Sequence, residues 1–276
     1  MTTLQETLTG LTRPGDLYTA ADGRGGVVCN ACGHHCHIPP GKSGTCWMRH
    51  NVDGTLQVPF GYASGLACDP IEKKPFFHLL PGQDALSFGM LGCNFHCPFC
   101  QNWVTSQALR DPNAVTGVQR IGPEEIIGLA ARAKARIIAS TYNEPLITTE
   151  WAVDIFRLAR ERGMLTAYVS NGFASPEVID YLDPWLDAIN IDLKCFTGAG
   201  YAWLGGHLEP VKEAIRAFWD RGKWVEVITL VVPGFNDTTD ELTGIAEFLA
   251  SVSPDLPWHV TAYHASYKMM DGPRST

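Results

Sequence analysis

The sequence predicts an α/β fold in which strand-like segments alternate with helices. From residue 85 onward, short apolar runs typical of buried strands are separated by stretches whose apolar residues recur at helical spacing. Strands connected by helices form parallel sheets with right-handed crossovers. Two tight groups of cysteines lie before and at the start of this region. Because 276 residues suit one large domain with an appendage, we predict an N-terminal Cys-rich segment over residues 1–80 and an α/β domain over residues 81–276.

Six segments have the length and composition of buried strands. Sequences such as ALSFGML, WLDAINIDL and WVEVITLVV are short, apolar and bounded by turn or helix signals. All six are expected to be parallel, since a helix separates each from the next. The predicted strands are residues 85–91, 136–141, 164–170, 185–193, 224–232 and 258–263.

The helices between these strands carry end signals as well as apolar faces. Ser175 followed by Pro176 is a cap with proline at the first helical position, and Thr238 with Glu241 has the spacing of a capping box. Gly163 ends a helix on its C-terminal side. The predicted helices are residues 123–133, 150–162, 176–182, 210–221 and a last one that begins after Thr238.

Composition and charge exclude several classes of function. The 21 basic and 29 acidic residues give a net charge of −8, which argues against a dominant nucleic-acid surface and disfavours a nucleic-acid partner. No apolar run reaches the roughly 18–20 residues of a membrane span, so no membrane partner is expected either. Residues 1–10 lack the pattern of a secretory signal. We therefore expect a cytoplasmic protein.

The second cysteine group supplies three thiolates within eight positions. Cys93, Cys97 and Cys100 lie in the sequence GCNFHCPFCQN, with no fourth cysteine nearby. A structural zinc ion needs four ligands, so this spacing fits zinc poorly. A [4Fe–4S] cluster held by three thiolates keeps one iron open to a substrate or cofactor. The alternatives are a Cys3His zinc site that uses His96, or buried thiols without metal.

This C-x3-C-x2-C loop, with Phe99 just before its last cysteine, resembles that of the radical S-adenosylmethionine (SAM) enzymes. The resemblance implies a partial (β/α)6 TIM-like barrel, which agrees with the six predicted strands. It also implies that Cys93, Cys97 and Cys100 are the catalytic cluster ligands and that SAM binds the open iron.

Polar residues follow the predicted strands, and in barrels of this kind the chemistry takes place at the carboxyl ends of strands. Asn143 and Glu144 occupy the place of a Gly-Gly-Glu-Pro stretch in related enzymes, although Tyr142 and Asn143 replace its glycines. Taken singly, each polar residue is equally an ordinary turn, capping or packing residue. The resemblance implies that the residues that bind SAM are Phe99, Asn143, Glu144, Ser170, Asn171, Asp192, Lys194 and Asn236.

The first cysteine group has the spacing C-x2-C-x3-C-x9-C. Cys29, Cys32, Cys36 and Cys46 are accompanied by histidines and glycines, and nothing in the sequence suggests secretion, so a metal is favoured over disulfides. Zinc and a second iron–sulfur cluster are equally compatible with this spacing. A metal-free Cys-rich loop is the alternative.

The order of further motifs sharpens the resemblance. A Cys-rich loop, the stretch DPIEKKPFFH at residues 69–78, and the Cys93 loop followed by Gln-Asn-Trp resemble the radical SAM enzymes of the AmmeMemoRadiSam system, which are relatives of the pyruvate formate-lyase activating enzymes. Residues 69–78 are equally interpreted as a linker that packs under the barrel. The chain ends at Thr276, earlier than the resemblance leads us to expect, which indicates a short member or a truncated chain.

The resemblance implies an oxidoreductase that cleaves SAM reductively to a 5′-deoxyadenosyl radical, which abstracts hydrogen from a substrate. It implies a flavodoxin- or ferredoxin-like electron donor. The substrate stays open between a glycine of a partner protein, as in glycyl-radical activases, a small molecule, and RNA. A non-catalytic iron–sulfur electron-transfer or scaffold protein and a zinc-binding interaction module are the competing hypotheses. Cys68 and Cys195 receive no role beyond that of small buried hydrophobic residues.

Overall fold

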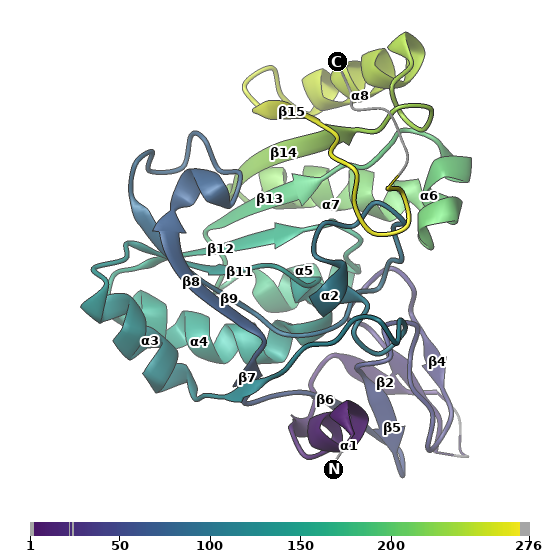
Figure 1. The fold of residues 1–276 in the computed structure, drawn as a ribbon, viewed down its shortest axis with the longest axis vertical. Helices are drawn as coiled ribbons and strands as arrows, with labels where there is room; N and C mark the ends of the chain where they lie inside the picture. Colours follow the sequence, from purple (N-terminus) through teal and green to yellow (C-terminus); the bar gives the residue numbers. More distant parts are fainter. Residues whose placement is uncertain (1–2, 22, 24, 271–276) are drawn as a thin grey trace.

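The computed structural model describes residues 3–21, 23 and 25–270, so the last residues of the chain, Pro273 to Thr276, lie outside the described part. Its centre is one seven-stranded sheet that curves around an interior, with helices on the outer face (Figure 1). The strand order is β15-β14-β13-β12-β11-β9-β8. These strands are β8 (Gly65–Pro70), β9 (Asp84–Gly89), β11 (Ile137–Ser140), β12 (Leu165–Ser170), β13 (Ala188–Asp192), β14 (Trp224–Val231) and β15 (Trp258–Ala262).

The six predicted strands are present and parallel, but the sheet is not wholly parallel. β8 adds a seventh strand that runs antiparallel to β9, with Gly65 opposite Gly89 and Pro70 opposite Asp84. The connection between the two strands contains only a short 3-10 helix, η1 (Ile71–Lys73), instead of a crossover helix. Such a connection returns the chain along the same edge of the sheet, which makes the pairing antiparallel. The expectation of an all-parallel sheet is corrected on this point.

The predicted helices form the crossovers between parallel strands. Ser175 caps its helix by accepting a hydrogen bond from the Val178 N–H at 3.1 Å. Thr238 caps the last helix by accepting a hydrogen bond from the Glu241 N–H at 3.3 Å. The Glu241 carboxylate accepts from the Phe196 N–H, so only the Thr238 half of the predicted capping box forms. The crossover helices are α3 (Pro123–Arg132), α4 (Thr149–Glu161), α5 (Pro176–Leu182), α7 (Leu208–Asp220) and α8 (Thr239–Val252).

Among the described residues, no helix is both long and apolar enough to span a membrane.

Short elements complete the molecule. Two three-stranded antiparallel sheets make up most of the N-terminal segment, and a two-stranded ribbon joins it to the segment before α3. The sheets have the orders β1-β6-β5, β2-β3-β4 and β10-β7, and their strands are β1 (Thr12–Pro14), β2 (Tyr18–Ala20), β3 (Val27–Cys29), β4 (His37–Ile38), β5 (His50–Val52), β6 (Thr55–Pro59), β7 (Tyr62–Ala63) and β10 (Gln119–Arg120). The remaining helices are α1 (Leu4–Thr9), α2 (Trp103–Ser106), η2 (Pro145–Thr148) and α6 (Gly198–Leu204).

The segment between β8 and β9 fills the amino-terminal end of the barrel. Ile71, Phe76 and Leu79 are buried there. They pack against small side chains on the inner face of the sheet, which include Ala85, Ala139, Ala167 and Ala188. Because β8 and this plug, residues 71–80, pack with the sheet, the barrel begins structurally before residue 81. The hypothesis that residues 69–78 pack under the barrel agrees with this arrangement.

Candidate active site

A cavity of about 680 Å³ opens at the carboxyl ends of the parallel strands. All three cysteines of the second group line it, together with seven of the eight side chains expected to bind SAM. Those seven are Phe99, Asn143, Glu144, Ser170, Asn171, Asp192 and Lys194. Side chains that are far apart in the sequence meet here because each follows a neighbouring parallel strand.

The loop after β9 presents three free thiols to this cavity. Cys97 is buried, while Cys93 and Cys100 are half-buried. The Phe95 N–H donates to Cys93 Sγ at 3.3 Å, and Cys100 Sγ lies 3.3 Å from the Ser106 hydroxyl. Burial raises the pKa of Cys97 to about 12 and that of Cys93 well above its ordinary value. Thiols of this kind become thiolates when a metal takes the place of the proton.

The number of thiols fits a multi-iron cluster better than a single zinc ion. Cys93, Cys97 and Cys100 are the three cysteines in the described lining of the cavity. A structural zinc ion takes four protein ligands, whereas a [4Fe–4S] cluster can be held by three thiolates. His96 is exposed and faces Gly205, and the described lining of the cavity does not include it. The donor set therefore fits a [4Fe–4S] cluster with three thiolate ligands, and the Cys3His zinc alternative is disfavoured.

The segment after β15 covers this loop from outside (Figure 1). The Lys268 N–H donates to the Pro98 carbonyl at 2.9 Å, and the Ser266 hydroxyl donates to the Cys100 carbonyl at 3.2 Å. The Tyr267 ring stacks on Trp103 with ring centroids 5.1 Å apart. These contacts fix the backbone around two of the three thiols.

Glu144 lies buried at the end of β11 and is held by three donors. Its carboxylate accepts hydrogen bonds from the Ser170 hydroxyl at 2.7 Å, the Asn171 N–H at 2.8 Å and the Leu146 N–H at 3.0 Å. Burial raises its pKa to about 7, although these donors lower it. The carboxylate is thus oriented beside the cysteines and becomes fully charged only above neutral pH.

Tyr142 takes a left-handed backbone conformation. Its φ is +73°, in the left-handed region that side chains rarely adopt. Its hydroxyl accepts a hydrogen bond at 2.7 Å from Lys74 Nζ, which helps to hold this conformation. Close by, Gly89 leaves no room for a side chain, because a Cβ there would lie 2.5 Å from the Thr141 carbonyl oxygen. Tyr142 therefore occupies a conformation that glycine adopts more readily.

Lys194 and Asp192 form an ion pair at the end of β13. Lys194 Nζ lies 2.5 Å from Asp192 Oδ2, and the side chains are 14% and 32% exposed. Burial lowers the pKa of Lys194, but the Asp192 carboxylate and the nearby Cys97 and Cys100 raise it above its ordinary value. The ammonium is therefore a fixed positive charge next to the thiols. Asn171 lies across the cavity and donates to Asn94 Oδ1 at 2.7 Å.

Asn236 is not brought into the cavity with the other predicted residues. Its Oδ1 accepts from the Val232 N–H at 2.7 Å, while its Nδ2 donates to the carbonyls of Lys194 at 2.7 Å and Leu230 at 2.8 Å. The buried side chain is fully engaged in these bonds, and Asn236 is absent from the described residues that line the cavity. Its position connects the loop after β14 to the backbone of Lys194 instead of offering a contact to a ligand.

Sequence reasoning missed the contribution of the plug to the cavity. Lys73, Lys74 and Pro75 line it from the side of β8. The rule that chemistry sits at strand ends does not select residues that enter from a preceding loop. The unusual charged stretch Glu-Lys-Lys at residues 72–74 was the available signal.

The first cysteine group lies in the N-terminal segment beside the barrel. Cys29, Cys32 and Cys46 are buried and Cys36 is half-buried. Burial raises the pKa of the three buried thiols, and backbone N–H groups oppose this by donating toward their sulfurs. The Thr45 N–H donates to Cys36 Sγ at 3.4 Å. Of the two cysteines without an assigned role, Cys195 is buried as expected but Cys68 is exposed, because it lies on the edge strand β8.

Comparison with known proteins decides the family. Residues 89–249 match the model of the radical SAM superfamily. The chain belongs to the radical SAM superfamily. The match includes the Cys93 loop and the strands that follow it, so the thiols and the polar strand ends belong to the family's shared domain.

Individual relatives of this radical SAM protein are consistent with the match. The chain is 38% identical to an uncharacterized protein of Methanocaldococcus jannaschii over 90% of its own length and 73% of that protein. It is 29% identical to the (2S)-3-sulfopropanediol sulfolyase activating enzyme of Bilophila wadsworthia, over 44% of this chain and 41% of that one. It is 23% identical to the pyruvate formate-lyase-activating enzyme of Clostridium pasteurianum, over 63% of this chain and 72% of that one.

A solved structure supports the fold. SuiB of Streptococcus suis superposes with a TM-score of 0.52 at 12% sequence identity, over 68% of this chain and 41% of SuiB. The predicted radical SAM barrel is therefore confirmed. The protein is a radical SAM enzyme related to the activating enzymes, and the family implies a [4Fe–4S] cluster and SAM. The assignment to the AmmeMemoRadiSam system stays a prediction.

Proposed function

We propose that this enzyme cleaves SAM reductively in the cavity at the carboxyl ends of its strands and abstracts hydrogen from a substrate bound there. The observation that carries the proposal is the meeting of three free thiols with seven predicted polar and aromatic side chains around one cavity. In this proposal Cys93, Cys97 and Cys100 hold the cluster. When bound, the cluster supplies one electron to the SAM sulfonium, which yields methionine and a 5′-deoxyadenosyl radical.

The side chains around the thiols have the charges that SAM requires. Glu144 offers an oriented carboxylate to an ammonium group, and Lys194 offers an ammonium to a carboxylate. Ser170 and Asn171 orient Glu144, while Asp192 fixes Lys194. Asn143 accepts from the Met90 N–H at 2.9 Å and so holds the strand end, and Phe99 packs against Phe235 with ring centroids 5.6 Å apart. Asn236 acts as a positioning residue through the Lys194 carbonyl.

The test is 5′-deoxyadenosine formation from SAM after anaerobic reconstitution with iron and sulfide and chemical reduction. Wild type is expected to form the product, and Cys97→Ala is expected to form none. Cys195→Ala is the matched control, since Cys195 is a buried thiol that does not line the cavity. It should retain activity. Product formation by Cys97→Ala at the wild-type rate would refute the proposal.

We further propose that the hydrogen donor is a backbone glycine of a partner protein and that the electron donor is flavodoxin- or ferredoxin-like. We propose a cytoplasmic location as well, because both cysteine groups need a reducing compartment to stay free of disulfides.

The relation to two enzymes named as activating enzymes supports a protein substrate. A glycyl radical detected by electron paramagnetic resonance on a candidate partner, dependent on this enzyme and SAM, tests the assignment. SAM turnover coupled only to a small molecule would refute it.

We also propose a second metal at Cys29, Cys32, Cys36 and Cys46, either zinc or an iron–sulfur cluster. The Thr45 N–H donates to Cys36 Sγ at 3.4 Å, and backbone N–H groups are directed at the other three sulfurs, which supports bound thiolates. Metal analysis of a Cys93→Ala/Cys97→Ala/Cys100→Ala variant should find zinc or iron that is absent when Cys32→Ser is added. Equal metal content with and without Cys32→Ser would refute the site.

A further inference from the structure

A cluster of two histidines and a glutamate lies near the amino ends of two strands of the barrel, whereas the cavity opens at the carboxyl ends of the strands. Glu226 is near the start of β14 and His259 near the start of β15, while His78 comes from the plug. Residues farther along the same two strands, such as Leu230 and Thr261, line the cavity. The cluster is thus separate from the site proposed for SAM.

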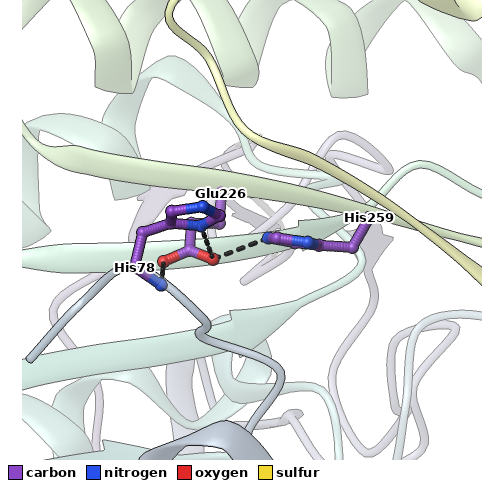
Figure 2. A group of neighbouring side chains, drawn as sticks. All are labelled: His78, Glu226 and His259. Carbon is purple, nitrogen blue, oxygen red and sulfur yellow. Dashed lines mark hydrogen bonds and ion pairs between the residues drawn. The ribbon is translucent and has the colours of Figure 1, made fainter. Parts of the chain in front are cut away.

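The ligand atoms of the three side chains converge on one carboxylate oxygen. Glu226 Oε2 lies 2.7 Å from His259 Nε2 and 3.5 Å from His78 Nδ1 (Figure 2). All three ligand atoms lie within 4.8 Å of one another. Within the described part of the chain, this is the one group of three or more such residues with that spacing.

The other carboxylate oxygen of Glu226 is already occupied by donors. Oε1 accepts from the His78 N–H at 3.0 Å, the Leu79 N–H at 3.1 Å and Trp224 Nε1 at 3.0 Å. Oε2 receives one backbone donor, the Phe77 N–H at 2.9 Å, and otherwise faces the imidazoles. Ligating carboxylates are commonly fixed in this way by outer hydrogen bonds, which leave one oxygen for the metal. The arrangement therefore presents a single, oriented carboxylate ligand.

Burial and exposure give the cluster an inner and an outer side. The Glu226 side chain is fully buried, that of His259 is 15% exposed, and that of His78 is 55% exposed. The two imidazoles are stacked with ring centroids 5.4 Å apart. An ion bound here would have buried ligands behind it and a side open to solvent.

We propose that His78, Glu226 and His259 bind a divalent transition metal ion of the zinc type, with solvent in the remaining position. Two imidazoles and one carboxylate are a known three-ligand set for Zn²⁺, whose bonds of roughly 2.0–2.2 Å place tetrahedral ligands about 3.4 Å apart. The 3.5 Å separation of His78 Nδ1 from Glu226 Oε2 already meets this value, and the pair at 2.7 Å needs to open by about 0.7 Å. The ion would then connect the exposed His78 of the plug to Glu226 on β14 and to His259 on β15.

The bound ion would fasten the plug to the far edge of the sheet. His78 belongs to the segment that contains Phe76 and Leu79, which pack on the inner face of the sheet. Glu226 already holds that segment through three backbone N–H groups. A metal adds a bond from the plug to β15 through His259. The site is thus inferred to close the amino-terminal end of the barrel.

The experiment is a Zn²⁺ titration of the cluster-reconstituted protein, followed by competition with a chromophoric chelator. Beyond any metal held by the cysteine groups, we expect wild type to bind one further equivalent of Zn²⁺. His78→Gln and His259→Gln should bind this equivalent at least about 100-fold more weakly, because each variant loses a direct ligand. His207→Gln is the matched control, since His207 is exposed and its side chain makes no capping hydrogen bond. It should bind as wild type does.

A Co²⁺ spectrum distinguishes this site from the cysteine groups. Co²⁺ bound by imidazole and carboxylate should give visible ligand-field bands without the sulfur charge-transfer absorption of a thiolate site, and His78→Gln should remove those bands. Because His78 is exposed, this variant is expected to fold, and circular dichroism checks that it does. Equal Zn²⁺ binding by wild type, His78→Gln and His259→Gln would overturn the proposal and identify a purely hydrogen-bonded cluster. The SAM cleavage assay is independent of this result.

Discussion

Glu150→Gln tests how the N-terminal segment is held to the barrel. Glu150 lies in α4 and pairs with Arg49, which immediately precedes β5; the side chains are fully buried and 1% exposed, respectively. Arg49 donates to both carboxylate oxygens at 2.6 and 2.8 Å, and also to the Ile147 carbonyl at 3.1 Å. Replacing the carboxylate by a neutral amide leaves the guanidinium buried without its counter-charge.

The magnitude follows from the burial of both partners. Breaking a buried pair by removing one charge costs roughly 3–5 kcal/mol of the free energy of unfolding. For a chain of this size, that cost lowers Tm by about 6–20 °C. Glu209→Gln is the matched control, because Glu209 forms an ion pair with Lys212 at 2.9 Å but its side chain is 65% exposed. An exposed pair contributes roughly 0–1 kcal/mol, so this variant should melt close to wild type.

The pH dependence gives an independent check. Burial raises the pKa of Glu150, but Arg49 and the hydrogen bonds outweigh burial and hold it below the ordinary value of 4.5. A lowered carboxyl pKa contributes stability that is present above pH 4.5 and is lost as the pH falls through the pKa of the folded protein. The difference between wild type and Glu150→Gln should therefore be largest near neutral pH and shrink in acid. Anaerobic thermal melts measure it. A Glu150→Gln variant as stable as Glu209→Gln at pH 7 would refute the reasoning.

Three further predictions concern the barrel itself. The folded-state pKa of Glu144 is about 7 instead of 4.5. As the pH rises from 4.5 to 7 without ligands, the free energy of unfolding of wild type should therefore fall by up to roughly 3 kcal/mol relative to Glu144→Gln. Parallel melts that show no such loss would contradict the raised pKa. Phe76→Ala should cost about 3–5 kcal/mol by emptying the plug, which urea unfolding measures; a loss under 1 kcal/mol would mean that the plug does not support the sheet. Tyr142→Gly should relieve about 1 kcal/mol of backbone strain but should lose the hydrogen bond from Lys74. The two effects oppose each other, so melts should show a net change in the free energy of unfolding within about 1 kcal/mol. A loss above roughly 3 kcal/mol would contradict this balance.

Local patterns predicted the barrel well because its elements are defined by neighbours in sequence. The strand at residues 224–232 and the cap at Ser175 are both found, since apolar runs and capping residues act within a few positions. The antiparallel strand β8 was not predicted, because GLACDP lacks the apolar run of a buried strand and its burial is only partial. Its place in the sheet depends on pairing with β9, a tertiary effect.

The candidate site likewise contains residues that local patterns predict and residues whose role only the folded chain determines. Cys97 and Glu144 were predicted because a loop motif and the ends of parallel strands can be identified from sequence. Asn236 met the same rule, yet its amide is bound by three backbone groups that only the folded loop supplies. No local pattern connects His78 with Glu226, since they lie 148 positions apart in the sequence. Their proximity arises when the plug crosses the barrel to its opposite edge.

Both hydrogen bonds and apolar packing attach the N-terminal segment to the barrel. The predicted boundary at residue 80 therefore does not separate two independent structural units. Asn94, next to the proposed cluster ligand Cys93, accepts from His34 Nε2 at 3.0 Å through its carbonyl and from Asn171 through its side chain. The Cys29–Cys46 region therefore contacts the loop that presents Cys93. At the other end, the plug carries Lys74 into the cavity and Phe76 into the core. The segment thus supports the geometry of the candidate active site from both ends of the barrel, a role that a detachable metal-binding appendage could not perform.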